Sequence, residues 1–390
     1  MDAIRFRHRP ANDFYAAVSR RVSAHFRQSG KSRYADGLFW AKAALFGGLA
    51  AASYALILWH PFPVWVLVPI ALVYGVSTLL LNINVGHDAA HGTIVRNRWA
   101  NALIQFGCFS LVGVNAYLWR MRHTNSHHIF PNVNGCDIDI DENPLIRLSP
   151  NQPWRAHFRF QHIYAPLAYV LVVLHTVLFQ DFVYLFKREL ANMRDIRHPR
   201  FEYALFLLSK AIYFGLTLGL PLALLPLPWW QVVLGYLGMT AGVSLLFVFL
   251  LVGTHFSERT DFPMTDAAGN LDRTWAEHNL ATACDWAPES WWAHFFAGGV
   301  NAHAAHHLFP RVCHTHYRAI ARIIIEVTDE FGVPYNRTSL PEMVRSHFAF
   351  LRRLGRKPVG ITPDTPVVTS GRIIRLVGRL GVLTRARTRT

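Results

Sequence analysis

Residues 211–253 read AIYFGLTLGLPLALLPLPWWQVVLGYLGMTAGVSLLFVFLLVG, a run of 43 residues without a charged side chain. Pro221, Pro226 and Pro228 interrupt it near its middle. A helix of about 20 apolar residues crosses the hydrocarbon core of a bilayer, so this run is long enough for two spans. We therefore expect two membrane-crossing helices joined by a turn at the prolines.

A second run of the same kind lies upstream. From Ala43 to Val85 only His60 can carry a charge, and Pro61 and Pro63 interrupt the run. Over all 390 residues the composition is 52% hydrophobic and 16% charged, which is unlike an ordinary soluble protein. The sequence predicts an all-α integral membrane protein with four transmembrane helices in two hairpins.

The basic residues indicate how these helices are oriented. Both proline-containing turns lack Lys and Arg, whereas the segment before residue 37 and the C-terminal region are rich in them. Cytoplasmic loops carry an excess of Lys and Arg, so we expect a multi-pass protein with both termini cytoplasmic, in the inner membrane if the cell is bacterial. The first 36 residues show no apolar core typical of a secretory signal peptide. A net charge of +15 fits attraction to anionic membrane lipid, and we expect no nucleic-acid partner.

Histidines are concentrated in three short clusters. Eight of the 21 histidines fall in them: His87 and His91; His123, His127 and His128; His303, His306 and His307. Spacings of three and four residues put side chains on one face of a helix. Neutral imidazole suits iron, copper, nickel and zinc. The clusters therefore predict a metal site, and because HExxH is absent they do not indicate a zinc protease.

Two further apolar segments affect where the clusters lie. Residues 100–118 contain Asn101, Gln105 and Asn115, which favours a segment that lies at the interface or dips into the membrane and returns. Residues 165–186 contain His175, Gln180 and Asp181, so they either cross or lie in the interface. A crossing would put the second and third clusters on opposite sides. We favour interfacial helices and a cytoplasmic histidine-rich cap that holds all three clusters.

The domain organisation follows from these segments. We expect a basic cytoplasmic N-terminal segment over residues 1–37, a membrane domain over 38–340 and a basic tail over 341–390. Within the tail, residues 373–383 form either a surface-lying amphipathic helix or a flexible basic segment. The four cysteines form no CxxC motif, and we expect them to be reduced.

Three motifs resemble those of the membrane-bound fatty acid desaturases, which have histidine boxes of the forms HxxxH, HxxxHH and HxxHH. Gly86-His-Asp-Ala-Ala-His-Gly92 is similar to the first box. Arg122-His-Thr-Asn-Ser-His-His128, with Asp137, Asp139 and Asp141 after it, is similar to the second. Gly298-Gly-Val-Asn-Ala-His-Ala-Ala-His-His-Leu-Phe-Pro310 is similar to the third box of the acyl-CoA and acyl-lipid branch, near the front-end desaturases.

The resemblance implies an enzyme with two iron ions that uses O2 to introduce a double bond into a fatty acyl chain carried by CoA, carrier protein or lipid. It implies no catalytic residue beyond the metal ligands, which are the eight clustered histidines and His255. Candidate partners of these ligands are Asp88, Asn125, Asp137, Asp285 and Asn301; Asp139, Asp141 and Glu142 are further acidic candidates. His278 lies near the site in relatives, and Trp119, Trp291, Trp292 and Phe295 either line an acyl channel or pack in the core.

This sequence departs from the family pattern at two points, and each limits which family properties can be expected of it. His303 stands where many front-end relatives have Gln, so the bond position is left open. The chain has no His-Pro-Gly-Gly haem motif, so we expect a separate electron donor of the ferredoxin or cytochrome b5 type with its reductase. Fatty acyl hydroxylase and acetylenase remain alternatives within the family. A membrane metal transporter or sensor is a remote alternative, because transport predicts polar residues inside the spans.

Overall fold

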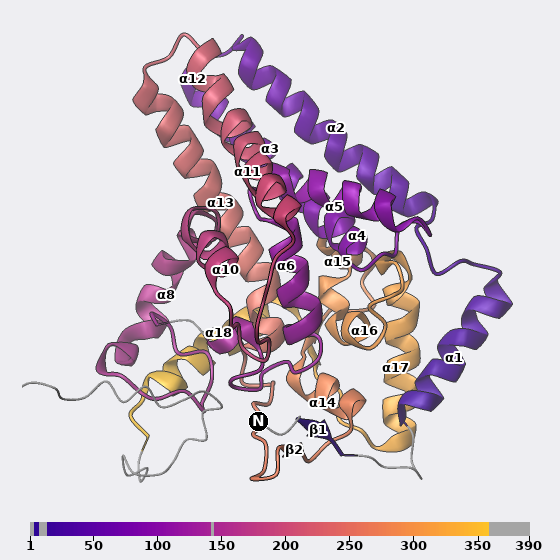
Figure 1. Cartoon of the computed structure of the whole chain (residues 1–390). Coiled ribbons are helices and arrows are strands. Elements are labelled where there is room, and N and C mark those ends of the chain that lie inside the picture. The colour runs from indigo at the N-terminus through magenta and orange to yellow at the C-terminus, as the bar shows by residue number, and fades with distance from the viewer. Residues whose placement is uncertain (1–3, 8–13, 142–143, 359–390) are drawn as a thin grey trace, which may run out of the picture.

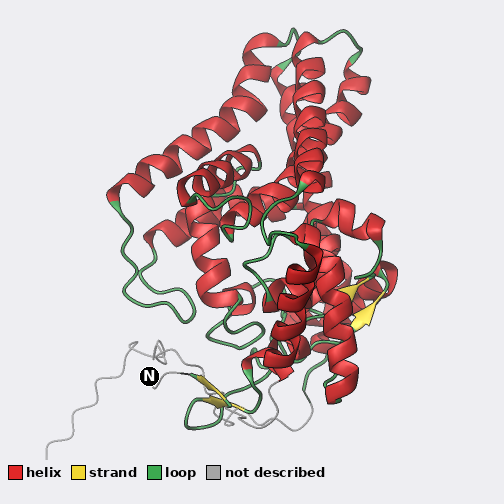
Figure 2. Ribbon diagram, turned by 90° about the vertical axis from the view of Figure 1, so that its right-hand side faces the viewer, coloured by secondary structure: helices red, strands yellow, loops and turns green. Residues whose placement is uncertain are grey.

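The structure is a computed structural model that describes residues 4–7, 14–141 and 144–358. Glu142 and the predicted amphipathic segment 373–383 lie outside these residues. The described chain is mostly helical, with an elongated upper bundle and a broader lower part (Figures 1 and 2).

Four helical segments are long and apolar enough to cross a membrane: Gly37–Trp59, Val64–Ala90, Arg200–Leu224 and Trp229–His255. They form the upper bundle in Figure 1. Leu207, Leu234 and Val68 point outward from it with 65%, 59% and 53% of their surface exposed. Exposed apolar side chains over such lengths fit a lipid environment. The predicted helical membrane protein is therefore confirmed.

The first and second spans are α2 (Gly37–Trp59) and α3 (Val64–Leu81), and α3 runs through a π-helical turn (Asn82–Gly86) into α4 (His87–Ala90). The third joins α11 (Arg200–Phe214) through a π-helical turn (Gly215–Gly219) to α12 (Leu220–Leu224), and the fourth is α13 (Trp229–His255). The breaks between paired spans fall at Pro61 and Pro63, and at Pro226 and Pro228, as the sequence predicts.

Two bent helix pairs correspond to the two ambiguous apolar segments. The first pair bends by 106°. It consists of α5 (Arg98–Leu111) and the helical stretch Ala116–His127, which begins with α6 (Ala116–Arg122). The second, Ala156–Val170 with Val172–Phe186, bends by 67° and contains α8 (Gln161–Val170), α9 (Val172–His175) and α10 (Asp181–Phe186). A bend of 106° fits the prediction of a segment that enters and returns.

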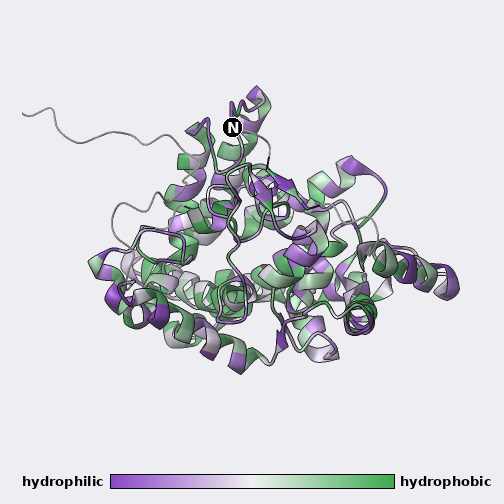
Figure 3. Ribbon diagram, turned by 90° about the horizontal axis from the view of Figure 1, so that it is seen from below, coloured by the Kyte–Doolittle hydropathy of each residue, from purple (hydrophilic) through white to green (hydrophobic). Residues whose placement is uncertain are grey.

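The remaining elements build the lower part. Its helices are α1 (Phe14–Ser29), α7 (Ile138–Asp141), α14 (Trp275–Thr282), α15 (Trp291–Ala297), α16 (His303–Leu308), α17 (Tyr317–Phe331) and α18 (Leu340–Gly355). Its strands form two parallel pairs, β1 (Arg5–Phe6) with β2 (Asn270–Leu271), and β3 (Asp285–Trp286) with β4 (Arg337–Thr338). Seen from below, many of these helices carry hydrophilic and hydrophobic residues side by side (Figure 3).

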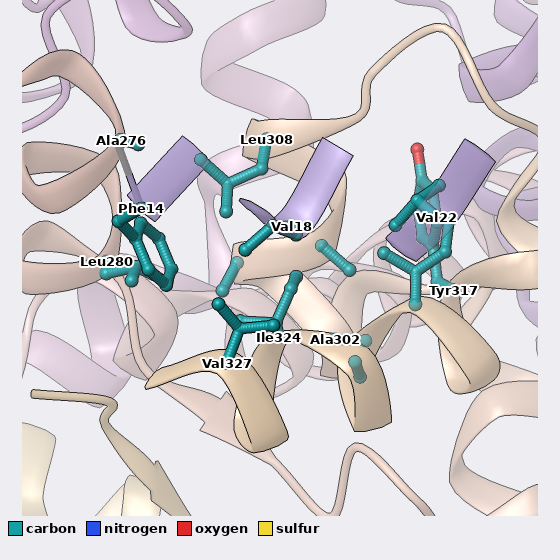
Figure 4. Close-up of a cluster of buried hydrophobic side chains, with 14 of the residues drawn as sticks. Phe14, Val18, Val22, Ala276, Leu280, Ala302, Leu308, Tyr317, Ile324 and Val327 are labelled. Carbon is teal, nitrogen blue, oxygen red and sulfur yellow. The ribbon is translucent and has the colours of Figure 1, made fainter. Parts of the chain in front are cut away.

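Helix α1 belongs to the core of this lower part. Phe14, Val18 and Val22 are buried in one cluster with Leu308 of α16 and Ile324 of α17 (Figure 4). Helix α18 likewise buries residues on one side, among them Met343, Phe350 and Leu351. Both helices lie in segments that the sequence assigned to a basic N-terminal segment and a basic tail, and both pack around the elements that carry the histidines.

Candidate metal centre

All nine histidines predicted as ligands lie together at the junction of the upper bundle and the lower part. Eight of them form two groups in which one ring nitrogen of each histidine lies within 4.8 Å of the others. The first group is His87, His91, His123 and His306; the second is His127, His255, His303 and His307. We call these the first and second histidine groups.

His128 lies between the two groups. Its Nε2 is 3.0 Å from Nε2 of His123 in the first group, and its ring stacks at 4.5 Å on the ring of His307 in the second. Its ring is also 4.5 Å from that of His306. The nine imidazoles therefore form one continuous cluster with two centres.

Local backbone geometry explains the spacing of the second box. Residues His123–His127 form a π-helical turn, in which the amide of His128 donates to the carbonyl of His123 at 3.0 Å. This wider turn brings residues five apart onto one side of the helix, and such turns are frequent at functional sites. It puts His123 and His128 beside each other, while His127 points to the second group.

The chemistry of the rings fits metal ions. Ring nitrogens face each other at distances such as 2.8 Å between Nε2 of His303 and of His255, and 3.3 Å between Nε2 of His87 and of His123. Within the described chain, Nε2 of His91 and of His306 has no hydrogen-bond partner. Burial, followed by repulsion from neighbouring imidazoles, holds the pKa values of His306 and His307 well below 6.5. Neutral rings with converging lone pairs can bind a cation.

Hydrogen bonds on the outer side of the cluster orient several rings. Nδ1 of His127 lies 3.2 Å from Asp137, Nδ1 of His255 lies 2.8 Å from the carbonyl oxygen of Thr282, and Nδ1 of His307 lies 2.9 Å from Oδ1 of Asn279. A longer contact of 3.4 Å joins Nδ1 of His306 to the hydroxyl of Tyr317. Histidines that bind metal through one nitrogen usually donate from the other, which fixes the ring.

The matches to known proteins agree with this geometry. Residues 63–339 match the family model described as fatty acid desaturase. The chain belongs to the fatty acid desaturase family. It is 30% identical over 353 residues to the sn-1 linoleoyl-lipid 6-desaturase of Synechocystis sp., which covers 88% of this chain and 96% of that protein.

Two further relatives show the same similarity over most of this desaturase. The sn-1 linoleoyl-lipid 6-desaturase of Arthrospira platensis is 30% identical over 91% of this chain and 95% of its own. The acyl-lipid (8-3)-desaturase of Physcomitrium patens is 29% identical over 88% of this chain and 72% of its own. The predicted family and the predicted activity, introduction of a double bond into a fatty acyl chain, are confirmed.

Among the predicted ligand partners, the structure brings Asp137 and Asp88 to the desaturase's histidines. Asp88 lies 3.9 Å from Nδ1 of His87. Asp139 is 3.5 Å from Nδ1 of His127. Asp137 also accepts from the backbone amide of Asn132 at 2.9 Å, so its position is fixed independently of the imidazole.

Other predicted partners bond elsewhere. Asn125 is exposed and accepts from Thr124, and Asn301 is buried and donates to the carbonyl of Ala287 at 3.2 Å. Asp285 accepts hydrogen bonds from the amide of Ala304 and the hydroxyl of Tyr335. It therefore supports the start of α16 without bonding to an imidazole of the cluster. Burial raises the pKa of Asp285 to about 7.

His278, the other histidine considered near the site, lies outside the cluster. Its Nε2 donates to the carbonyl of Pro131 at 3.0 Å, and its ring meets Phe6 edge on. Among the predicted aromatic residues, Trp119 stacks on His123 with ring centres 4.2 Å apart. Trp291 and Trp292 are 42% and 67% exposed on α15.

Asn279 and Tyr317 were not predicted as partners of the ligands, although the pair His316-Tyr317 after the third box is part of the family resemblance. Asn279 lies on α14 and Tyr317 begins α17, and Asn279 has no motif that would separate it from an ordinary polar core residue. Their contacts with His307 and His306 depend on how these helices pack against α16. Asn279 could have been found only as a buried polar group on a helix beside the third box.

Proposed function

We propose that this desaturase binds two iron ions, one in each histidine group, and uses O2 to remove two hydrogens from a fatty acyl chain. The observation that carries the proposal is the pair of four-histidine groups joined by His128. Imidazole without thiolate suits redox iron, although it also accommodates zinc and copper. The iron pair would supply the oxidant that an unactivated C–H bond requires.

The residues of the chain would hold and isolate this centre. His87, His91, His123 and His306 would bind one iron ion, and His127, His255, His303 and His307 the other, with His128 available to either. Asp137, Asn279 and the carbonyl of Thr282 would keep their rings turned inward. Burial favours the neutral form of His306 and His307, which is the form that binds metal.

The substrate and the electron donor follow from the relatives and the charge. The relatives named above act on acyl lipids, and we propose the same class of acyl carrier for this chain. Electrons would come from a separate ferredoxin or cytochrome b5 type donor. We further propose that the termini and the histidine cluster are cytoplasmic, because Lys and Arg are concentrated in the segments beside them.

Metal analysis and lipid analysis together test the proposal. Purified protein should contain about two irons per chain, and a host that expresses it should accumulate new double bonds in its membrane lipids, detected by gas chromatography with mass spectrometry. Stoichiometric zinc without iron would contradict the proposal. New hydroxyl groups or triple bonds instead of double bonds would identify the hydroxylase or acetylenase alternative.

A further inference from the structure

Lys42 is a buried cation near the start of the first span. Only 1% of its surface is exposed, and α2 carries it beside the loop that follows the third histidine box. Its Nζ lies 2.7 Å from Nε2 of His314 and 3.4 Å from the carbonyl oxygen of His294. Among the described residues it has no ion pair with a carboxylate. A charge in such a place is costly and is usually retained for a function.

The contact with Lys42 fixes the tautomer of His314. An ammonium group only donates hydrogen bonds, so Nε2 of His314 must accept and its Nδ1 must carry the proton. Nδ1 lies 2.9 Å from Oδ2 of Asp88, and the backbone amide of His314 donates to the same oxygen at 3.0 Å. The neutral ring therefore connects the positive charge of Lys42 to the negative charge of Asp88.

Asp88 extends this connection to the first histidine group. Its Oδ1 is 3.9 Å from Nδ1 of His87, an electrostatic contact longer than a hydrogen bond, and that nitrogen has no hydrogen-bond partner in the described chain. Nε2 of His87 faces His123 at 3.3 Å, which is the side where a metal would bind. The carboxylate thus lies behind the ring of His87. His294 holds the arrangement in place, because its Nε2 donates to the carbonyl of His314 at 2.6 Å.

We propose that Lys42, His314 and Asp88 form a relay of positioning residues that orients His87 and strengthens metal binding in the first histidine group. This inference rests on the proposed function, since it assumes that the group binds a metal. Carboxylates behind a ligating imidazole raise its affinity for metal, and removing them typically costs about 10- to 100-fold. In this chain the carboxylate would itself depend on a lysine contributed by a membrane span.

A third metal site is the competing explanation. Asp88, Cys313 and His314 present ligand atoms within 4.8 Å of one another. The ammonium of Lys42 lies 2.7 Å from Nε2 of His314, however, and both Nδ1 and the amide of His314 are directed at Asp88. These contacts occupy Oδ2 of Asp88 and both ring nitrogens of His314, two of the three ligands that a third cation would need, so the geometry favours the relay.

The test is the release of Fe²⁺ to a chelator from anaerobic, fully loaded protein. Wild type should hold two ions per chain. Lys42→Met should release one of them roughly tenfold faster and leave the other at the wild-type rate. Asp88→Asn should have the same effect, and Lys42→Met combined with Asp88→Asn should be no worse than Asp88→Asn alone, because both act through the same carboxylate.

His314→Asn provides a second variant if Lys42→Met does not fold. Its side-chain amide can still donate to Asp88, but the shorter side chain has no acceptor at the position of Nε2 that faces Lys42, and we expect the same selective loss of one ion. Wild-type release of both ions from a folded Lys42→Met or His314→Asn protein would overturn the relay. A third ion in wild type that is lost in His314→Asn would also overturn it. Failure of wild type to hold two ions would refute the proposed function, whatever the variants do.

Discussion

At the scale of single residues, two buried histidines differ in their relation to the metal centre. His306 and His278 are 2% and 0% exposed, but only His306 directs a ring nitrogen at the first histidine group. We expect His306→Ala to lower double-bond formation by at least about 100-fold and to reduce bound iron. His278→Ala should retain both irons, since its ring bonds to the carbonyl of Pro131.

Iron content by mass spectrometry and host lipid composition check this pair of variants. Both proteins must first be shown to insert into the membrane and to elute as single species. Equal iron content in the two variants would remove His306 from the ligand set.

A second pair of variants tests Asn279, which sequence reasoning did not identify. Asn279 and Asn301 are both 0% exposed and both donate to a backbone carbonyl, but only Asn279 bonds to a ring of the cluster. Asn279→Leu should weaken iron binding in the second histidine group by about 10- to 100-fold. Asn301→Leu should leave iron binding close to wild type. The two variants are compared by chelator titration, and equal affinities would show that Asn279 has no role in holding His307.

At the scale of elements, α1 connects the N-terminal segment to the third histidine box. Phe14 is 3% exposed in the cluster that also contains Leu308, one residue after His307. Phe14→Ala should lower the free energy of unfolding by about 3–5 kcal/mol, since it removes a buried aromatic ring. Arg20→Ala, an exposed position on the same helix, should change it little. Thermal unfolding in detergent measures both, and similar midpoints would mean that α1 does not contribute to the core.

A buried ion pair fixes the segment between α5 and α6. Nζ of Lys210 lies 2.8 Å from Asp181 and 2.7 Å from the carbonyl of Gly113, and Asp181 accepts the amide of Asn115. Lys210→Met should destabilise the protein by about 3–5 kcal/mol because it leaves Asp181 unpaired, and adding Asp181→Asn should recover part of this loss. A double variant as unstable as Lys210→Met alone would contradict this account.

The elements differ in how well the sequence predicts them. The uncharged parts of the four spans were predictable because long apolar runs have no other stable location, and prolines indicate the turns between them. The starts of the first and third spans were not, since α2 contains Lys42 and α11 contains Glu202 and Lys210. Helix α1 and helix α18 were assigned to basic terminal segments because their exposed faces carry most of their charge. The apolar faces of α1 and α18 can be assigned to the core only when the structure shows that α17 and the upper bundle cover them.

At the scale of the whole molecule, the histidine cluster should make stability depend on pH. Burial and neighbouring imidazoles lower the pKa values of His303, His306 and His307 in the folded protein, whereas in the unfolded chain they titrate near 6.5. Below that pH these three histidines bind more protons in the unfolded state, so their contribution makes the metal-free protein lose stability as the pH falls below about 6.5. His127 acts in the opposite direction, because burial is outweighed by Asp137, which raises its pKa to about 9, so the stability it contributes is lost as the pH rises through about 9. Above about pH 6.5, His303, His306 and His307 are neutral in both the folded and the unfolded state, so they do not make the free energy of unfolding depend on pH.

Thermal unfolding of metal-free and iron-loaded protein between about pH 8 and pH 5 checks this expectation. Bound metal stabilises the neutral form of its ligands, so the loaded protein should retain its stability to lower pH. Identical pH profiles for the two forms would contradict it.

The cluster itself was more predictable than its surroundings. Eight histidines could be singled out because the boxes repeat a spacing that helices place on one face, and the resemblance to the desaturases added His255 at the end of a predictable span. Lys42 and Asn279 could not, since each is one ordinary polar residue whose role depends on a contact made across the fold. Asn125 and Asn301 were predicted from their position beside boxes, and adjacency in sequence did not bring them to the rings.

The division of each histidine group among distant parts of the chain has a consequence for biosynthesis. The first group combines residues 87, 91 and 123 with His306, and the second combines residues 127 and 255 with His303 and His307. The first group is complete only after the ribosome has passed residue 306, and the second after residue 307, when all four spans have already been made. If each group binds a metal as proposed, both ions would be acquired late, by a chain whose spans are already made, because a nascent fragment would hold only an incomplete set of ligands.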